Sequence, residues 1–396
     1  MILILGLTQQ ALNFIFSLFV ANLYMEKYII NKIYSSYAIY SFFVAIIAGP
    51  IAHSIVISLK LKIKSDLYCD AIFRIFRMPS LVTLLLSCLC IVATQYFCDQ
   101  DKKFEIFSNI FFIQSIVFQI YCNILIVKLL CGKKIVHSIV GTLVGLGFSI
   151  IFLLIKSFKI EFYDFALSIL TGSLATFIIL LIFTFENNRV KLEINFHEIA
   201  NIVRFDKLVS GLLITFPLIF LPAAYTFIGS KFNNINVLYL TIPLSFASLI
   251  TLLGSFSKYF EVMTNNVKAP IIGDYKNLKR ATLVTIYSWL VVFFCFALGH
   301  NLFYNLVFTN YEIIGFGVIS FSSVFISRLN ILRIGEFGVS GGYKKLYLLP
   351  FLSLLTILPA LLIAFYTTNL ILYSLSYLMS IAVNEITLRV SNKFYS

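Results

Sequence analysis

The chain has 396 residues, of which 60% are hydrophobic and only 12% are charged, whereas soluble globular domains carry about 25% charged residues. This composition excludes a single water-soluble core and indicates a membrane protein. The net charge of +13 does not indicate nucleic-acid binding, because the Lys and Arg residues form short clusters between apolar runs. The seven Cys residues have no regular spacing, so we predict neither a metal site nor a cofactor.

Apolar runs of roughly 20 residues, the length that crosses a bilayer as a helix, recur along the whole chain. We predict an all-α membrane protein with about twelve transmembrane helices in the ranges 2–24, 34–59, 80–97, 104–130, 135–155, 162–185, 208–228, 235–256, 281–298, 311–326, 346–366 and 370–390. Helices are expected because an open sheet edge cannot lie in lipid.

The distribution of basic residues predicts the orientation. If the N-terminus lies inside and the spans alternate, 23 of the 30 Lys and Arg residues fall at the inner side and 7 at the outer side. Because basic residues concentrate in cytoplasmic loops, this asymmetry predicts that both termini are cytoplasmic. We expect a multi-pass protein of the bacterial inner membrane.

The two halves of the chain resemble each other weakly. The fourth span leads into Gly132-Lys133-Lys134, and the tenth leads into Gly341-Gly342-Tyr343-Lys344-Lys345. Six helices followed by six in the same orientation indicate a parallel repeat about an axis normal to the membrane. We predict an N-terminal half at 1–186, a cytoplasmic linker at 187–207 and a C-terminal half at 208–396.

Several short stretches carry a resemblance to a known family. They are Gln9-Gln10-Ala11-Leu12-Asn13-Phe14, Tyr37-Ala38-Ile39-Tyr40 with Gly49, Val267-Lys268-Ala269-Pro270 with Tyr275-Lys276-Asn277, and Val307-Phe308-Thr309-Asn310-Tyr311. In these stretches and in its layout, the chain resembles Wzx-type flippases of the multidrug/oligosaccharidyl-lipid/polysaccharide (MOP) exporter superfamily.

The resemblance implies that the protein moves its cargo without changing it chemically and needs no cofactor. The cargo would be an undecaprenyl-pyrophosphate-linked oligosaccharide repeat unit for O-antigen, lipopolysaccharide or capsular polysaccharide assembly. Its partners would be this lipid-linked glycan, membrane lipids and other polysaccharide-assembly proteins, but no nucleic acid. The polar head would cross through a cavity between the two halves, which would open to each side in turn.

Polar residues inside the spans are candidates for binding this cargo, because such residues are costly in lipid. The candidates are His53, Lys128, Lys258, Arg328, Arg389, Gln114, Gln119 and Asn123, with Glu385 as a coupling carboxylate. Each also has a structural interpretation. His53 packs as a neutral ring, the lysines and Arg328 reach for the interface, and the amides join helices by hydrogen bonds. Glu385 and Arg389 share a helix face, so they can form an ion pair.

Two other classes of protein remain open. An ion-coupled multidrug exporter of the same superfamily needs a buried carboxylate; the first span has none, but Glu385 could serve. An integral-membrane enzyme of polysaccharide synthesis needs a cluster of acid–base groups at the membrane edge. The four His residues form no such cluster with Asp or Glu, so we predict no catalytic residue.

Overall fold

The computed structural model describes about three quarters of residues 1–186 and a smaller part of residues 208–396. The described residues are 31–44, 46–47, 65–97, 100–131, 134–156, 161, 163–185, 220–230 and 348–395, with shorter pieces at 5, 8–9, 11–13, 15–16, 19–20, 319, 322–323 and 326. All of these residues are helical except the connecting positions 134, 161, 163 and 367–369.

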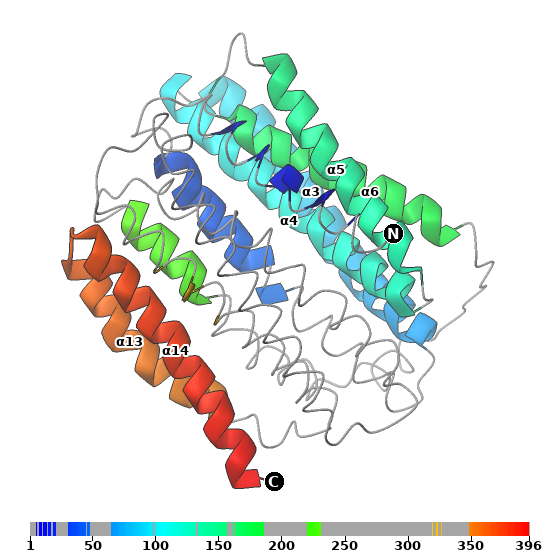
Figure 1. Cartoon of the computed structure of the whole chain (residues 1–396). Helices are drawn as coiled ribbons and strands as arrows, with labels where there is room; N and C mark the ends of the chain where they lie inside the picture. The colour runs from blue at the N-terminus through cyan, green and yellow to red at the C-terminus, as the bar shows by residue number, and fades with distance from the viewer. Residues whose placement is uncertain are drawn as a thin grey trace.

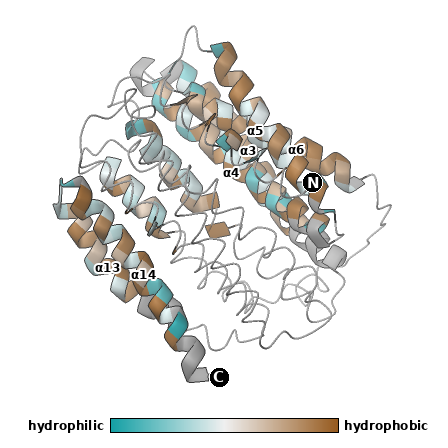
Figure 2. Ribbon diagram, in the orientation of Figure 1, coloured by the Kyte–Doolittle hydropathy of each residue, from teal (hydrophilic) through white to brown (hydrophobic). Residues whose placement is uncertain are grey.

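The helices with described bounds are α3 (Ser65–Phe97), α4 (Gln100–Cys131), α5 (Ile135–Lys156), α6 (Asp164–Phe185), α13 (Leu348–Tyr366) and α14 (Leu370–Tyr395). Within the described residues, four helices, α3 to α6, are long and apolar enough to cross a membrane. Figure 2 shows hydrophobic residues dominating α5 and α6 along their length. The chain is therefore a multi-pass membrane protein.

The predicted spans agree with α4, α5, α6 and α13 to within a few residues, but the start of α3 was predicted wrongly. The sequence indicated a helix from Ser80, directly after Pro79, with Arg74 and Arg77 in an inner loop. Instead, α3 begins at Ser65 and contains Pro79. The first fifteen residues of α3, 65–79, mix charged and apolar side chains, so the sequence shows no continuous apolar run there. α14 likewise continues beyond its predicted end at Val390, to Tyr395.

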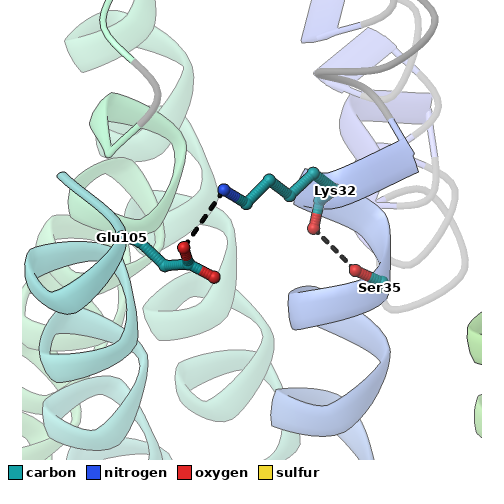
Figure 3. A network of polar contacts seen from close by, with 3 residues as sticks. All are labelled: Lys32, Ser35 and Glu105. Carbon is teal, nitrogen blue, oxygen red and sulfur yellow. Dashed lines mark hydrogen bonds and ion pairs between the residues drawn. The ribbon is translucent and has the colours of Figure 1, made fainter. Parts of the chain in front are cut away.

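Helices α3 to α6 pack as an antiparallel bundle (Figure 1). At one end, Lys32 contacts Glu105 at the start of α4 with 3.2 Å between Nζ and Oε2, as Figure 3 shows. At the same end, Lys156 at the end of α5 lies 3.6 Å from the fully buried Asp164 at the start of α6. At the other end, His137 and Phe183 meet edge to face. The alternating direction predicted for these four spans is confirmed.

Small residues allow α5 and α6 to approach each other closely. A Cβ atom on Gly145 would lie 2.5 Å from the backbone oxygen of Gly172, and one on Gly172 would lie 2.8 Å from the backbone oxygen of Gly145. The Ser149 hydroxyl donates a hydrogen bond across the same contact to the Ser168 carbonyl at 2.8 Å. In lipid, such close backbone packing replaces the hydrophobic effect as the force that holds helices together.

Two hydrophobic cores lie on different parts of the described chain. The first joins the helical segment 31–44 to α4, α5 and α6 through residues that include Tyr40, Phe112 and Phe165. The second joins the segment 220–230 to α13 and α14 through residues that include Leu221 and Tyr373. In Figure 1 the α13–α14 pair lies on the opposite side of the view from α3 to α6.

Candidate functional site

The described structure contains five of the eight residues predicted to bind cargo, together with Glu385. His53, Lys258 and Arg328 lie outside the described residues. Lys128, Gln114, Gln119 and Asn123 lie on α4, and Arg389 and Glu385 lie on α14. The candidates therefore form two groups, each on its own helix.

The α4 group includes a hydrogen-bonded contact between helices. Nε2 of Gln119 donates to the Ser173 hydroxyl on α6 at 2.9 Å. The Tyr40 hydroxyl also bonds to Ser173, which joins a third helical segment to the same point. Cys122 is fully buried, and its thiol donates to the Ser173 carbonyl. We call Tyr40, Gln119, Cys122 and Ser173 the Ser173 node; this contact matches the structural interpretation of Gln119.

The remaining α4 candidates stay within or near their own helix. Nδ2 of Asn123 donates to the Gln119 carbonyl, one turn earlier, at 2.8 Å. Gln114 is half-buried, and the half-buried Lys128 lies in the last turn of α4. Lys128 is placed where a cation can reach the membrane interface.

A line of buried polar residues runs along α14. Ser376, Ser380 and Asn384 follow one another at four-residue intervals, and each is less than a tenth exposed. The Tyr225 hydroxyl, from the segment 220–230, donates to Ser376 at 3.0 Å and lies 3.4 Å from the Ser380 hydroxyl. Tyr373 in turn donates its hydroxyl to the Tyr225 carbonyl. We call Tyr225, Ser376, Ser380 and Asn384 the α14 polar line.

The polar line ends in a buried amide oxygen. Oδ1 of Asn384 is buried and accepts no hydrogen bond from the described residues. A buried acceptor without a donor is costly by about 1–3 kcal/mol, so such an atom favours a bound donor. A hydroxyl group is one donor that an amide oxygen accepts.

An ion pair follows directly on the same helix. Nε of Arg389 lies 2.8 Å from Oε1 of Glu385, so the predicted pair is confirmed. The carboxylate side chain is 8% exposed, whereas the arginine side chain is 59% exposed. Because the arginine neutralises the buried carboxylate while much of its own surface stays open, the pair presents positive rather than negative charge.

Sequence reasoning missed Tyr225, Ser376, Ser380 and Asn384. The spacing of 376, 380 and 384 was a usable signal, because residues four apart share one helix face. Serine is common in membrane helices, however, and nothing in the sequence brings Tyr225 to α14 across about 150 positions.

Among the described residues, an aromatic contact links the segment 31–44 to the segment 220–230. The rings of Phe42 in the segment 31–44 and Phe220 in the segment 220–230 lie 5.9 Å apart at an interplanar angle of 67°. This edge-to-face arrangement is favourable for aromatic rings. The segments that carry these rings are the ones that also carry Tyr40 of the Ser173 node and Tyr225 of the polar line.

Solved membrane transporters share this architecture. The chain is similar over 99% of its length to the lipid II flippase MurJ in an inward closed conformation, with a TM-score of 0.68, 13% identity and 86% of that chain covered. It is similar over 99% of its length to a MOP-superfamily transporter from Pyrococcus furiosus, with a TM-score of 0.60, 12% identity and 93% of that chain covered.

The multidrug transporter DinF-BH has the same fold, with a TM-score of 0.62, 12% identity and coverage of all of this chain and 95% of the other. Transporters of this kind have twelve transmembrane helices in two halves, so the predicted fold class is confirmed. No protein-family model matches the sequence, and no curated protein matches it by sequence. The structural neighbours are transporters and flippases rather than enzymes.

Proposed function

We propose that the chain flips an undecaprenyl-pyrophosphate-linked oligosaccharide repeat unit across the bacterial inner membrane for O-antigen or capsular polysaccharide assembly. The observation that carries the proposal is the charge arrangement on α14. Arg389 neutralises the buried Glu385 and still has an open guanidinium surface, which suits an anionic pyrophosphate. The buried oxygen of Asn384, five residues before Arg389 on the same helix, suits a donor such as a sugar hydroxyl.

Further support comes from the comparison with MurJ. Its TM-score of 0.68 exceeds the 0.60 and 0.62 of the Pyrococcus furiosus transporter and DinF-BH. In this proposal Lys128, Gln114 and Asn123 contribute from the N-terminal half, and His53, Lys258 and Arg328 complete the set. Gln119 supports them structurally through its hydrogen bond to Ser173. The halves are 1–186 and 208–396, joined by a cytoplasmic linker at 187–207; both termini are cytoplasmic, and the chain catalyses no reaction.

A multidrug exporter is the second candidate. The structural similarity to DinF-BH and the buried Glu385 carboxylate favour it, because a protonatable carboxylate can couple transport to ions. The ion pair with Arg389 counts against it, since the carboxylate already has a cationic partner within its own helix.

Deleting the gene tests the proposal. The deletion strain is expected to accumulate undecaprenyl-linked repeat units at the inner leaflet and to lose long surface polysaccharide, and a plasmid copy should restore both. Lipid extracts resolved by mass spectrometry and polysaccharide gels provide the measurement. Unchanged polysaccharide together with new sensitivity to cationic drugs would contradict the proposal and support the exporter.

A further inference from the structure

α3 presents a surface that neither the Ser173 node nor the α14 polar line uses. Over the membrane-spanning window Phe73–Gln95, only 11% of α3 is buried, compared with 33–56% for the windows in α4, α5 and α6. Among the described helices, α3 packs mainly against α4, so most of its circumference is open. It therefore offers a long face to whatever surrounds the bundle.

Along that face of α3, basic residues come first and apolar residues follow. Two exposed arginines, Arg74 and Arg77, stand in the first turn of the window. An exposed apolar stripe follows on the same side at helical spacing: Met78, Leu81, Leu85, Leu89 and Val92. Viewed down the helix axis, where each residue turns by about 100°, these five positions lie within about 60° of Arg74.

The dimensions match one lipid molecule. From Arg74 to Leu85 the helix rises about 16 Å, which is close to half of the roughly 30 Å hydrocarbon core of a bilayer. A lipid lying along this stretch would place its headgroup at the arginines and one acyl chain against Met78, Leu81 and Leu85. Two guanidinium groups one turn apart match a phosphate, which they can bind through paired N–H donors.

We propose that Arg74, Arg77 and the stripe from Met78 to Leu85 form a binding site for an anionic glycerophospholipid. Charge complementarity selects this occupant, because an anionic lipid brings only negative charge to the two exposed arginines, whereas a zwitterionic lipid also brings a cation. The site lies in the leaflet at which α3 enters the membrane, the inner leaflet in the proposed orientation. It is distinct from the cargo site proposed above and does not depend on the cargo.

The test uses the full-length protein reconstituted in phosphatidylcholine nanodiscs that contain an equal amount of phosphatidylglycerol. After release into detergent, native mass spectrometry counts the molecules of each lipid that remain bound. The wild-type protein is expected to retain phosphatidylglycerol preferentially. Each arginine replaced by glutamine should lower that preference about five-fold, since a basic residue at the membrane surface contributes about that much.

The matched control is Lys134→Gln, which removes one cation just before α5, at the same end of the bundle as the start of α3. It should keep the wild-type preference, whereas Arg77→Gln should not. Arg74→Lys with Arg77→Lys keeps the charge and should retain most of the preference, which confirms that the loss in the glutamine variants is not misfolding. Asp70→Asn removes an acidic residue four positions before Arg74 in the sequence, so it should raise the preference for phosphatidylglycerol.

Three results would overturn the inference. One is an equal preference in the wild type and the Arg74→Gln/Arg77→Gln variant. Another is displacement of phosphatidylglycerol by an equal concentration of undecaprenyl pyrophosphate, which would make this surface part of the cargo path. The third is a disulfide-linked dimer formed by mild oxidation through the exposed Cys88 or Cys90, which would show that a second copy covers α3.

Discussion

The α5–α6 contact and the contact of the segment 220–230 with α14 both bury polar atoms between helices, but they use them differently. Along α5 and α6, glycines bring the backbones together, and the hydroxyls of Ser149 and Thr176 donate to the nearby carbonyls of Ser168 and Gly172. Along α14, the chain of hydroxyls leads to an amide oxygen that accepts no hydrogen bond from the described residues, and then to the Glu385–Arg389 pair.

This difference separates a scaffold from a binding surface. Around Gly145 and Gly172, the hydroxyls donate to carbonyls of the same two helices, which makes this contact rigid. A buried acceptor without a donor carries a free-energy cost, and a ligand that donates a hydrogen bond can remove it. A half-exposed cation beside it can attract an anionic group of the same ligand. This comparison indicates a structural role for the α5–α6 contact, and the proposed cargo-binding role falls on the end of the α14 polar line.

The largest expected effect comes from adding one methyl group to the scaffold. In Gly145→Ala the new Cβ would overlap the Thr176 hydroxyl and lie 2.5 Å from the Gly172 carbonyl oxygen, which belongs to a helix backbone and cannot rotate away. Overpacking of this kind costs about 1–3 kcal/mol, so the variant should melt at a clearly lower temperature in detergent. A fluorescence-detected thermal melt measures the change.

Gly147 provides the matched control, two residues away on the same helix. A Cβ atom there would meet nothing within 4 Å. Gly147→Ala should therefore stabilise the protein by up to about 1 kcal/mol, because alanine favours helix more than glycine does. If Gly145→Ala also raised the melting temperature, the close backbone contact between α5 and α6 would be refuted.

The sequence predicted the bounds of α4, α5, α6 and α13 well because each is a continuous apolar run with charges at its ends. It placed the start of α3 wrongly because the amphipathic extension before Ser80 does not look like a membrane span. A proline within a membrane helix is tolerated where neighbouring groups satisfy the freed carbonyl.

The candidate site was only partly predictable for a related reason. Glu385 and Arg389 were found because charges four residues apart in an apolar helix are conspicuous, and their partner lies on the same helix. Tyr225 was missed because it contacts α14 from a distant segment of the chain. Asn384 was missed because the sequence cannot show that its buried oxygen accepts no hydrogen bond from the described residues. Gln119 was identified as polar, but its partner Ser173 could be known only from how α6 packs on α4.

The second expected effect, intermediate in size, tests the charge on the binding surface. Arg389→Ala leaves the buried Glu385 carboxylate without its guanidinium. Because the arginine is 59% exposed, the loss of stability should be about 1 kcal/mol rather than the 3–5 kcal/mol of a fully buried pair. Surface-polysaccharide export should fall sharply while the protein still accumulates in the membrane, as gels and immunoblots can measure.

The double variant Arg389→Ala/Glu385→Gln separates the two roles of this pair. Replacing the carboxylate by a neutral amide removes the stranded charge, so the melting temperature should return close to that of the wild type. Export should stay impaired, because the cation that is proposed to bind the cargo is still missing. Restored export in the double variant would show that the pair is structural, and the proposed role of Arg389 would be withdrawn.

The smallest expected effect comes from removing one hydrogen bond between helices in each of the two regions. Tyr225→Phe removes the donor to Ser376, and Gln119→Leu removes the donor to Ser173. A hydrogen bond between membrane helices contributes about 0.6 kcal/mol on average, so both variants should lower thermal stability by a similar, small amount. Only Tyr225→Phe should also slow export, because Tyr225 positions the line that ends at Asn384, whereas Gln119 holds a scaffold contact. Equal export in the two variants, after normalising for protein in the membrane, would remove the distinction between the two regions.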